Sequence, residues 1–294
     1  MPVDKNTIVE WFKSLQDQIC GELTLADGSA AFEEELWNRE EGGGGRTRII
    51  QNGAVIEKGG VNFSEVFGEI PDFLLREHKA DSNQTFFATG ISIVIHPINP
   101  WVPIIHMNTR YFELGDNTKW FGGGIDLTPH YVDEEDAKFF HESLQIICDQ
   151  FDPSYHEEFK KWADTYFYIK HRKETRGIGG IFFDRLQETD SISLEKRFEF
   201  VKALGSSFAP IYTALILKSK NKAFGEKEKQ WQYLRRGRYV EFNLVYDKGT
   251  KFGLETNGRI ESILMSLPPQ ANWAYNFQPE KDSLEEKTLR YLAR

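Results

Sequence analysis

The sequence has few cysteines, no long apolar run and no excess of positive charge. Its 294 residues include two cysteines, Cys20 and Cys148, which form neither a zinc-ligand spacing nor a disulfide framework. We therefore expect a reducing compartment. No apolar run approaches the roughly 20 residues that cross a bilayer, so we expect no transmembrane segment. The formal net charge of −9 argues against nucleic acid as a general partner.

The first residues also lack the marks of a targeting segment. The start, MPVDKNTIVEWFKSLQ, contains acidic residues and has neither the apolar stretch of a signal peptide nor the Arg- and Ser-rich character of a transit peptide. We therefore interpret the protein as cytoplasmic. Aromatic residues, in contrast, are plentiful, with 23 Phe, 11 Tyr and 7 Trp. They suit a core packed on a sheet or a pocket for a large flat ligand.

Two candidate strands lie between residues 91 and 111. Isoleucine recurs at every second position of 91–95, and alternation resumes at 105–111 after two prolines. A period of two predicts strands with one apolar and one polar face. If the two strands pair, one surface carries a set of polar side chains: Ser92, His96, His106, Asn108 and Arg110.

Helices are predicted by apolar stripes and capping patterns elsewhere in the chain. The capping-box pattern Thr7-x-x-Glu10 opens the first helix, and the acidic run 133–136 opens another. The last helix begins at Ser283. The remaining predictions are helices at 5–21 and 154–172 and, at 193–221, one long helix or a pair broken near Gly205.

The four consecutive glycines Gly42–Gly45 leave two interpretations open. A phosphate-binding loop is excluded because no Gly-Lys-Ser/Thr follows. The run is either a mobile hairpin tip or a lid that brings Arg46 and Arg48 to an anionic ligand.

Alternating residues in 235–265 predict a three-stranded antiparallel meander. Its turns are Asp247-Lys248-Gly249 and Asn257-Gly258. Because the strands come in clusters, without strict βαβ alternation, the predicted class is α+β with a large antiparallel sheet. The length allows one large domain or two average ones. With no repeat, linker or low-complexity tail, we expect a single domain over 1–294.

The chemistry of the polar residues can be weighed before any resemblance is considered. Histidine is the usual base near neutral pH and a common metal ligand. The candidates His96, His106, His141 and His171 lack a ligand-type spacing, so a hydrogen-bonded structural role is favoured for His141 and His171. His106 is the better functional candidate because its strand face is polar. Arg110 needs an anionic partner, since arginine is almost never buried without one.

Five runs of the sequence resemble oxygen-dependent coproporphyrinogen III oxidase. They are IHPINPWVPIIHMNTRYFE, WFGGGIDLTP, YIKHRKETRGIGGIFFD, RRGRYVEFNLVYDKGTKFGLET and GRIESILMSLPP. The resemblance extends from the first helix to Trp273. It implies a broad antiparallel sheet sandwiched by helices, and a homodimer whose interface uses residues 239–274. It also implies oxidative decarboxylation of two propionates of coproporphyrinogen III to vinyls, giving protoporphyrinogen IX, with O2 as the electron acceptor in heme biosynthesis.

The resemblance also assigns roles to individual residues. His106 would donate a proton, and Asp247 would act on the pyrrole N–H groups. A divalent metal is assigned to His96, His106, His141 and His171 in one branch of the family, whereas other members are described as needing neither metal nor organic cofactor. The substrate contacts implied are Ser92, Asn108, Thr109, Arg110, Asn257, Gly258 and Arg259.

Three positions depart from the family pattern. Ile98 stands where arginine is frequent, which removes one possible carboxylate contact. Asn257 replaces a common glycine, and both residues tolerate a positive φ. Lys248 replaces a frequent arginine and loses bidentate geometry. Two rival functions stay open: a histidine-ligated, metal-dependent oxygenase or hydrolase, and a non-catalytic tetrapyrrole-binding protein.

Overall fold

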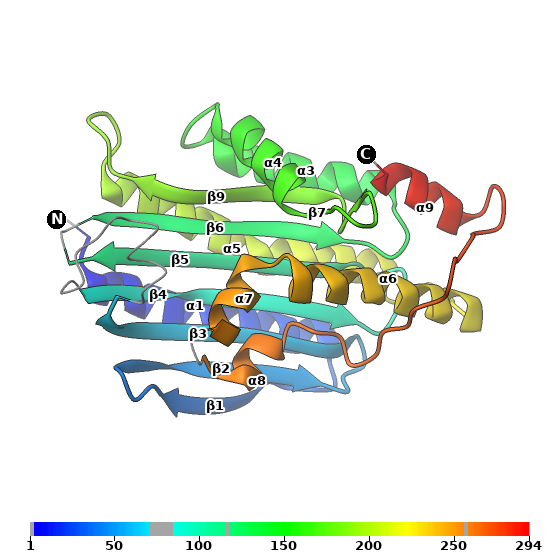
Figure 1. Cartoon of the computed structure of the whole chain (residues 1–294), viewed down its shortest axis with the longest axis horizontal. Helices are drawn as coiled ribbons and strands as arrows, with labels where there is room; N and C mark the ends of the chain where they lie inside the picture. The colour runs from blue at the N-terminus through cyan, green and yellow to red at the C-terminus, as the bar shows by residue number, and fades with distance from the viewer. Residues whose placement is uncertain (1–2, 71–84, 116–117, 256–257, 294) are drawn as a thin grey trace.

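A computed structural model describes residues 3–70, 85–115, 118–255 and 258–293. Its centre is a seven-stranded sheet in the order β1-β2-β3-β4-β5-β6-β9, with every neighbouring pair antiparallel (Figure 1). The strands of this sheet are β1 (Glu33–Asn38), β2 (Gly43–Gln51), β3 (Ile56–Glu69), β4 (Thr85–Pro97), β5 (Ile104–Leu114), β6 (Lys119–Thr128) and β9 (Gly179–Gln187). A separate two-stranded hairpin pairs β7 (Tyr168–Ile169) with β8 (Glu174–Thr175).

Helices cover both faces of the sheet, as Figure 1 shows. The helices are α1 (Lys5–Asp27), α3 (Glu134–Asp149), α4 (Tyr155–Tyr166), α5 (Leu194–Ser219), α6 (Glu226–Val245), α7 (Lys248–Glu255), α8 (Ile260–Leu264) and α9 (Leu284–Leu292). We call the face covered by α1 and α5 the back face, and the face under α6, α7 and α8 the front face. The predicted α+β class, with an antiparallel sheet between helices, is confirmed.

The main hydrophobic core lies on the back face. Ile91, Ile93 and Ile95 of β4 pack there with apolar residues of α1 and α5, and all three are essentially inaccessible to solvent. The register places Ile95 opposite Ile105 and Ile93 opposite Met107 of β5, so the predicted pairing of these two strands is confirmed. Since side chains alternate across a strand, the residues between these positions must face the front.

Helix α5 is long and apolar enough to span a membrane by length and composition. The sequence predicts one long helix or a pair of helices at 193–221 and no transmembrane segment. Many of its residues are buried against α1 and the sheet, which is the arrangement of a core helix. Helix α5 is continuous through Gly205. An added Cβ there would lie 2.8 Å from Leu15 and Trp11 of α1. The glycine therefore allows the two helices to approach closely.

The meander predicted over 235–265 is wrong, since these residues form α6, α7 and α8. The buried residues of α6 include Arg235, Arg236, Tyr239, Phe242 and Asn243, which recur at spacings of three and four. That is the period of a helix with one buried face. The alternation of apolar and polar residues in this segment does not reflect a strand. The segment is helical, and the side of α6 that faces the sheet is buried. Asn257 lies outside the described residues.

Two helix boundaries also differ from prediction. Asp4, not Thr7, caps α1, because its carboxylate accepts from the Thr7 backbone N–H at 2.8 Å. The helix then continues to Asp27 and ends at Gly28 with a φ of 80°. Helix α4 ends at Tyr166, short of the predicted 172, because the chain enters the β7–β8 hairpin.

Glycines 43–45 belong to β2 and are paired with β3 on one side, while Gly44 and Gly45 also pair with β1. An added Cβ at Gly45 would lie 2.3 Å from the Trp37 ring, so close packing requires the glycine. Arg46 and Arg48 both bind Asp17 of α1, at 3.0 and 2.7 Å. The lid interpretation is therefore wrong, and these arginines secure β2 to α1.

Candidate functional site

Polar side chains of β4, β5 and β9 gather on the front face of the sheet. The register aligns Ser92 with Asn108, and Asn108 with Gly124. Arg110 lies opposite Gly122 in the next row. We call the set Ser92, His106, Asn108, Arg110 and Asp184 the front polar surface; each of its side chains is partly exposed.

Arg110 is held by two neighbours on this surface. Its guanidinium donates to the Asn108 side-chain oxygen at 3.1 Å and to Asp184 Oδ1 at 2.9 Å. Both charged groups lie across Gly122, where an added Cβ would meet Asp184 Oδ1 at 2.4 Å. Glycine is thus required at position 122 for the pair to lie flat on the sheet. Nothing in the sequence pattern predicts a role for Asp184.

His106 bonds to a buried ion pair. Its Nδ1 lies 2.8 Å from Asp126 Oδ1, and Arg176 donates to the same oxygen at 2.6 Å. Burial alone would raise the pKa of Asp126, but the positive charge of Arg176 and the hydrogen bond from His106 lower it below its ordinary value. An ionised carboxylate only accepts, so His106 Nδ1 carries a proton. Nε2 of this 20% exposed ring is then the atom that can exchange protons.

Arg176 is itself fixed by aromatic rings and by α6. The side chain is 2% exposed and lies 4.4 to 4.7 Å from the ring centres of Phe167, Tyr239 and Phe242. It also donates to the Asn243 side-chain oxygen at 3.0 Å. A buried arginine with an ionised partner and cation–π contacts is rigidly placed. Helix α6 therefore orients His106 through Arg176 and Asp126.

Thr109 does not share the surface of its two neighbours. It pairs with Gly123 and lies between Asn108 and Arg110 in β5, so its side chain points to the back face. It is fully buried there. Ser92, Asn108 and Arg110 therefore lie together, whereas the Thr109 side chain lies on the opposite face, and its contact with substrate stays a prediction.

Arg259 lies further along the front face, at the start of α8. It donates to Ser262 Oγ at 3.0 Å and to Thr47 Oγ1 at 3.4 Å, and it pairs with Glu35 of β1. Thr47 aligns with Asn62, Ser92 and Asn108 in one row across the sheet. Gly258 precedes Arg259 and donates its N–H to the Gly253 carbonyl at 2.8 Å.

Asp247 occupies the N-terminal end of α7, not the turn of a meander. Its Oδ2 accepts from the Thr250 backbone N–H and hydroxyl, at 2.7 and 2.8 Å. Its Oδ1 accepts from the Tyr166 hydroxyl at 2.9 Å. Both oxygens are thus engaged, in the manner of an N-cap residue.

The four predicted metal ligands lie in different parts of the molecule. His96 is buried beneath α6 and bonds to the Ser266 carbonyl at 2.8 Å, while His141 of α3 bonds to the Ile178 carbonyl at 3.1 Å. His171, in the β7–β8 hairpin, bonds to Glu241 at 2.7 Å. Across residues 3–70, 85–115, 118–255 and 258–293, no three His, Cys, Asp or Glu side chains group as a metal site. The arrangement therefore does not fit a single ion shared by these histidines.

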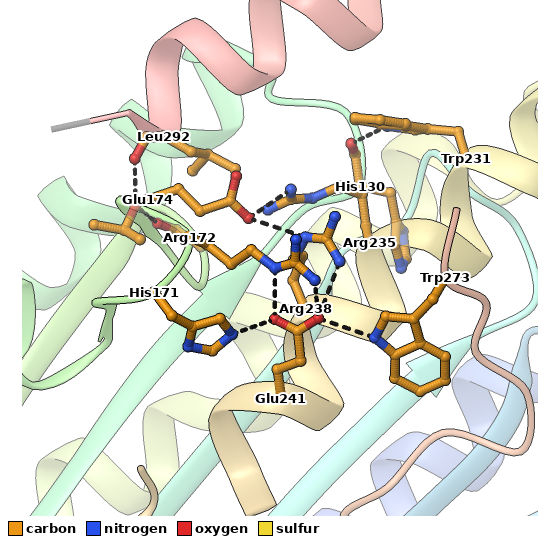
Figure 2. Close-up of polar contacts among 12 residues, drawn as sticks. His130, His171, Arg172, Glu174, Trp231, Arg235, Arg238, Glu241, Trp273 and Leu292 are labelled. Carbon is orange, nitrogen blue, oxygen red and sulfur yellow. Dashed lines mark hydrogen bonds and ion pairs between the residues drawn. The ribbon is translucent and has the colours of Figure 1, made fainter. Parts of the chain in front are cut away.

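Glu241 of α6 is instead the centre of a polar cluster, shown in Figure 2. It accepts from His171, Arg172, Arg238 and the Trp273 indole, with distances between 2.6 and 3.1 Å. Burial would raise its pKa, but these donors lower the pKa of Glu241 to about 2. The cluster joins the β7–β8 hairpin to α6 and to the segment at Trp273.

Asp126, Arg176 and Asp184 are the residues that sequence reasoning missed. Asp126 lies two residues after Gly124, so the two residues share one face of a strand. That alternation could have predicted that Asp126 lies beside His106. Arg176 is 50 residues from its partner, and Asp184 is 74 residues from Arg110. Pairs this far apart in the sequence leave no pattern among neighbouring residues that would predict them.

The sequence also matches a family model. The model described as coproporphyrinogen III oxidase matches residues 7–294, nearly the whole chain. The resemblance that rests on five motif runs is thereby confirmed. The family implies an oxidoreductase of porphyrin biosynthesis with coproporphyrinogen III as substrate. The chain belongs to the coproporphyrinogen III oxidase family.

Proposed function

We propose that the protein is the oxygen-dependent type of coproporphyrinogen III oxidase and forms protoporphyrinogen IX. Each propionate chain, with one O2 and one proton, would give a vinyl group, CO2 and hydrogen peroxide. The C–CO2 bond breaks, and the two electrons and the second proton pass from the substrate to oxygen. A porphyrinogen is electron-rich, so the substrate itself can supply these electrons.

The observation that carries this proposal is the spacing of two arginines along the front face. Arg110 bonds to Asn108, and Arg259 bonds to Thr47, at the two ends of one register row. Three strand spacings separate these ends, or roughly 14 Å. That is the scale of a tetrapyrrole with its propionates, and guanidinium groups pair well with carboxylates. The half-buried side chains of Asn62 and Ser92 lie between them.

His106 supports the chemistry because it shares the strand face of Arg110. The two residues are four positions apart in β5, or roughly 13 Å along the strand. Arg110 would hold a propionate, and His106 would move a proton at Nε2 while Asp126 and Arg176 keep Nδ1 protonated. A histidine oriented by a buried carboxylate is a common general acid–base arrangement.

Asp247 stays a predicted catalytic residue. To act on the pyrrole N–H groups, its carboxylate would have to leave the cap of α7 or share its bonds with Tyr166 and Thr250. Opening the first turn of α7 would provide that access. No step of the proposed chemistry is assigned to a metal or an organic cofactor, and metal analysis of active protein tests the divalent ion that the resemblance implies for one branch.

We also propose a homodimer in the cytoplasm, with residues 239–274 at the interface. Several apolar side chains of this region are exposed: Leu244, Val245, Leu254, Ile260 and Trp273. Exposed apolar side chains concentrated in one segment favour a protein–protein contact. Sedimentation measurements on the wild type and on a Leu244→Asp, Ile260→Asp variant test this interface, and an unchanged mass would contradict it.

The test of the function is turnover of coproporphyrinogen III with and without air. We expect vinyl products and CO2 in air, about one O2 consumed per vinyl as the proposed equation requires, and no product under anaerobic conditions. Equal product formation without oxygen would overturn the oxygen-dependent type. Binding without product would favour a tetrapyrrole-binding protein, and activity that a chelator abolishes and a divalent ion restores would favour the metal-dependent rival.

A further inference from the structure

The pair formed by Arg110 and Asp184 differs from the other ion pair of the site. The Arg110 and Asp184 side chains are 36% and 30% exposed, whereas those of Arg176 and Asp126 are 2% and 1% exposed. A partly exposed pair can be separated at little cost because water solvates both groups. A buried pair cannot, since either partner would be left as an uncompensated charge. The front polar surface thus contains an ion pair that can open, Arg110–Asp184, whereas the pair beneath His106, Arg176–Asp126, stays closed.

Arg259, at the Thr47 end of the row that runs from Thr47 to Asn108, also belongs to a partly exposed ion pair. It is 23% exposed and pairs with Glu35, which is 63% exposed. Both arginines that face the proposed substrate therefore already have an acidic partner from the protein. Asn108 would continue to hold Arg110 if Asp184 were displaced, because it bonds to a different guanidinium nitrogen.

The reaction changes the charge of the group that Arg110 would hold. A propionate carries one negative charge, and the vinyl group that replaces it carries none. After loss of CO2, an arginine without a second partner would be left facing an apolar group, which is unfavourable. Asp184 is close enough to bond to Arg110 again once the propionate has been lost.

We propose that Asp184 is a resident carboxylate that exchanges with the substrate propionate on Arg110. This inference rests on the proposed function. Asp184 holds Arg110 in the free and product-bound enzyme, the propionate replaces it in the substrate complex, and Asp184 returns when the vinyl forms. It acts through Arg110 and is therefore a positioning residue, which lowers affinity for the propionate and leaves affinity for the neutral product unchanged.

Binding of two oxidised porphyrins to an Asp184→Asn variant tests the exchange without requiring turnover. Coproporphyrin III retains all four propionates, whereas protoporphyrin IX carries vinyls at the two reacting positions. Removing the resident carboxylate frees Arg110 for the probe, so we expect the Kd of coproporphyrin III to fall about tenfold. The Kd of protoporphyrin IX should not change, because the variant loses the same ion pair in the free and bound states.

Three further variants make the result decisive. Asp184→Glu keeps the carboxylate and should retain wild-type selectivity between the two porphyrins. Asp17→Asn removes the partner of Arg46 and Arg48 near the opposite face and should change neither Kd. In an Arg110→Gln, Asp184→Asn double variant the gain in affinity should vanish. If Asp184→Asn folds poorly, Asp184→Ser replaces it.

Weaker binding of coproporphyrin III by Asp184→Asn would overturn the proposal, because it would show that Asp184 only positions Arg110 for the ligand. An equal change for both porphyrins would also contradict it. These outcomes are separate from failure of the oxidase function, which would be seen as absence of vinyl product while selective porphyrin binding persists.

Discussion

Successive residues of β4 and β5 face opposite sides of the sheet and meet different surroundings. On the back face, Ile93 and Met107 are fully buried among the residues of α1 and α5. On the front face, their neighbours Ser92 and Asn108 are partly exposed and lie beside Arg110. The contrast shows that β4 and β5 have two roles. Their back-face residues stabilise the fold, and their front-face residues form the candidate site. Substitutions on the two faces should therefore separate stability from activity.

The largest effect is expected at Asp247 on the front side. Asparagine caps helices about as well as aspartate, so Asp247→Asn should retain the fold and the start of α7. If the carboxylate acts on the pyrroles, turnover should be abolished while coproporphyrin III still binds. Steady-state product formation and fluorescence titration measure the two quantities. Near-normal turnover would leave Asp247 with its capping role alone.

Arg110→Ala should lower kcat/KM roughly 30-fold to several thousandfold, which corresponds to a loss of about 2–5 kcal/mol of transition-state stabilisation. The reason is that the substrate propionate loses its guanidinium partner in the site. The matched control is Arg48→Ala, which removes an arginine bonded to Asp17 and Glu34 near the back face. Equal loss of kcat/KM in both variants would contradict the assignment of the front face.

On the back face the order of effects should reverse. Ile93→Ala leaves a cavity in the core and should lower the free energy of unfolding by about 2–5 kcal/mol. Ser92→Ala, one residue away on the front face, should change it by no more than about 0.5 kcal/mol. Urea unfolding measures both. A large loss of stability in the Ser92 variant would show that the front face is also part of the core.

The smallest effect concerns pH and the cluster around Glu241. A carboxyl with a depressed pKa stabilises the fold above its ordinary pKa, and that stability is lost as the pH falls through the folded value. For Glu241 the loss should occur between about pH 4.5 and about pH 2. Glu241→Gln should therefore be less stable than wild type at pH 7, with a difference that shrinks toward pH 2. Glu142→Gln, which alters an exposed pair with Lys138, should show no such trend.

The sheet and its polar face could be predicted because their signal is local. Alternation at 91–95 and 105–111 defines the strands, and the register then brings Ser92, Asn108 and Arg110 together. Helix α3 begins next to its predicted start, where Asp133 caps it. These features depend on residues that are close together in the sequence, and they could therefore be predicted from it.

The helices α6 to α8 could not be assigned in the same way. Residues 238–246 contain β-branched and aromatic residues at alternate positions, but Tyr239, Phe242 and Asn243 are buried together only because α6 lies across the front face. The partners Asp126, Arg176 and Asp184 depend on the same tertiary arrangement. Local preference was overridden by packing, as is common for segments with mixed signals.

The most direct test of the front face as the active site is a crystal structure with coproporphyrin III bound. The account predicts that the macrocycle lies on the front face, with one propionate within hydrogen-bond distance of Arg110 and His106 beside the ring system. A macrocycle bound at any other surface, with Arg110 still paired only to Asn108 and Asp184, would contradict it.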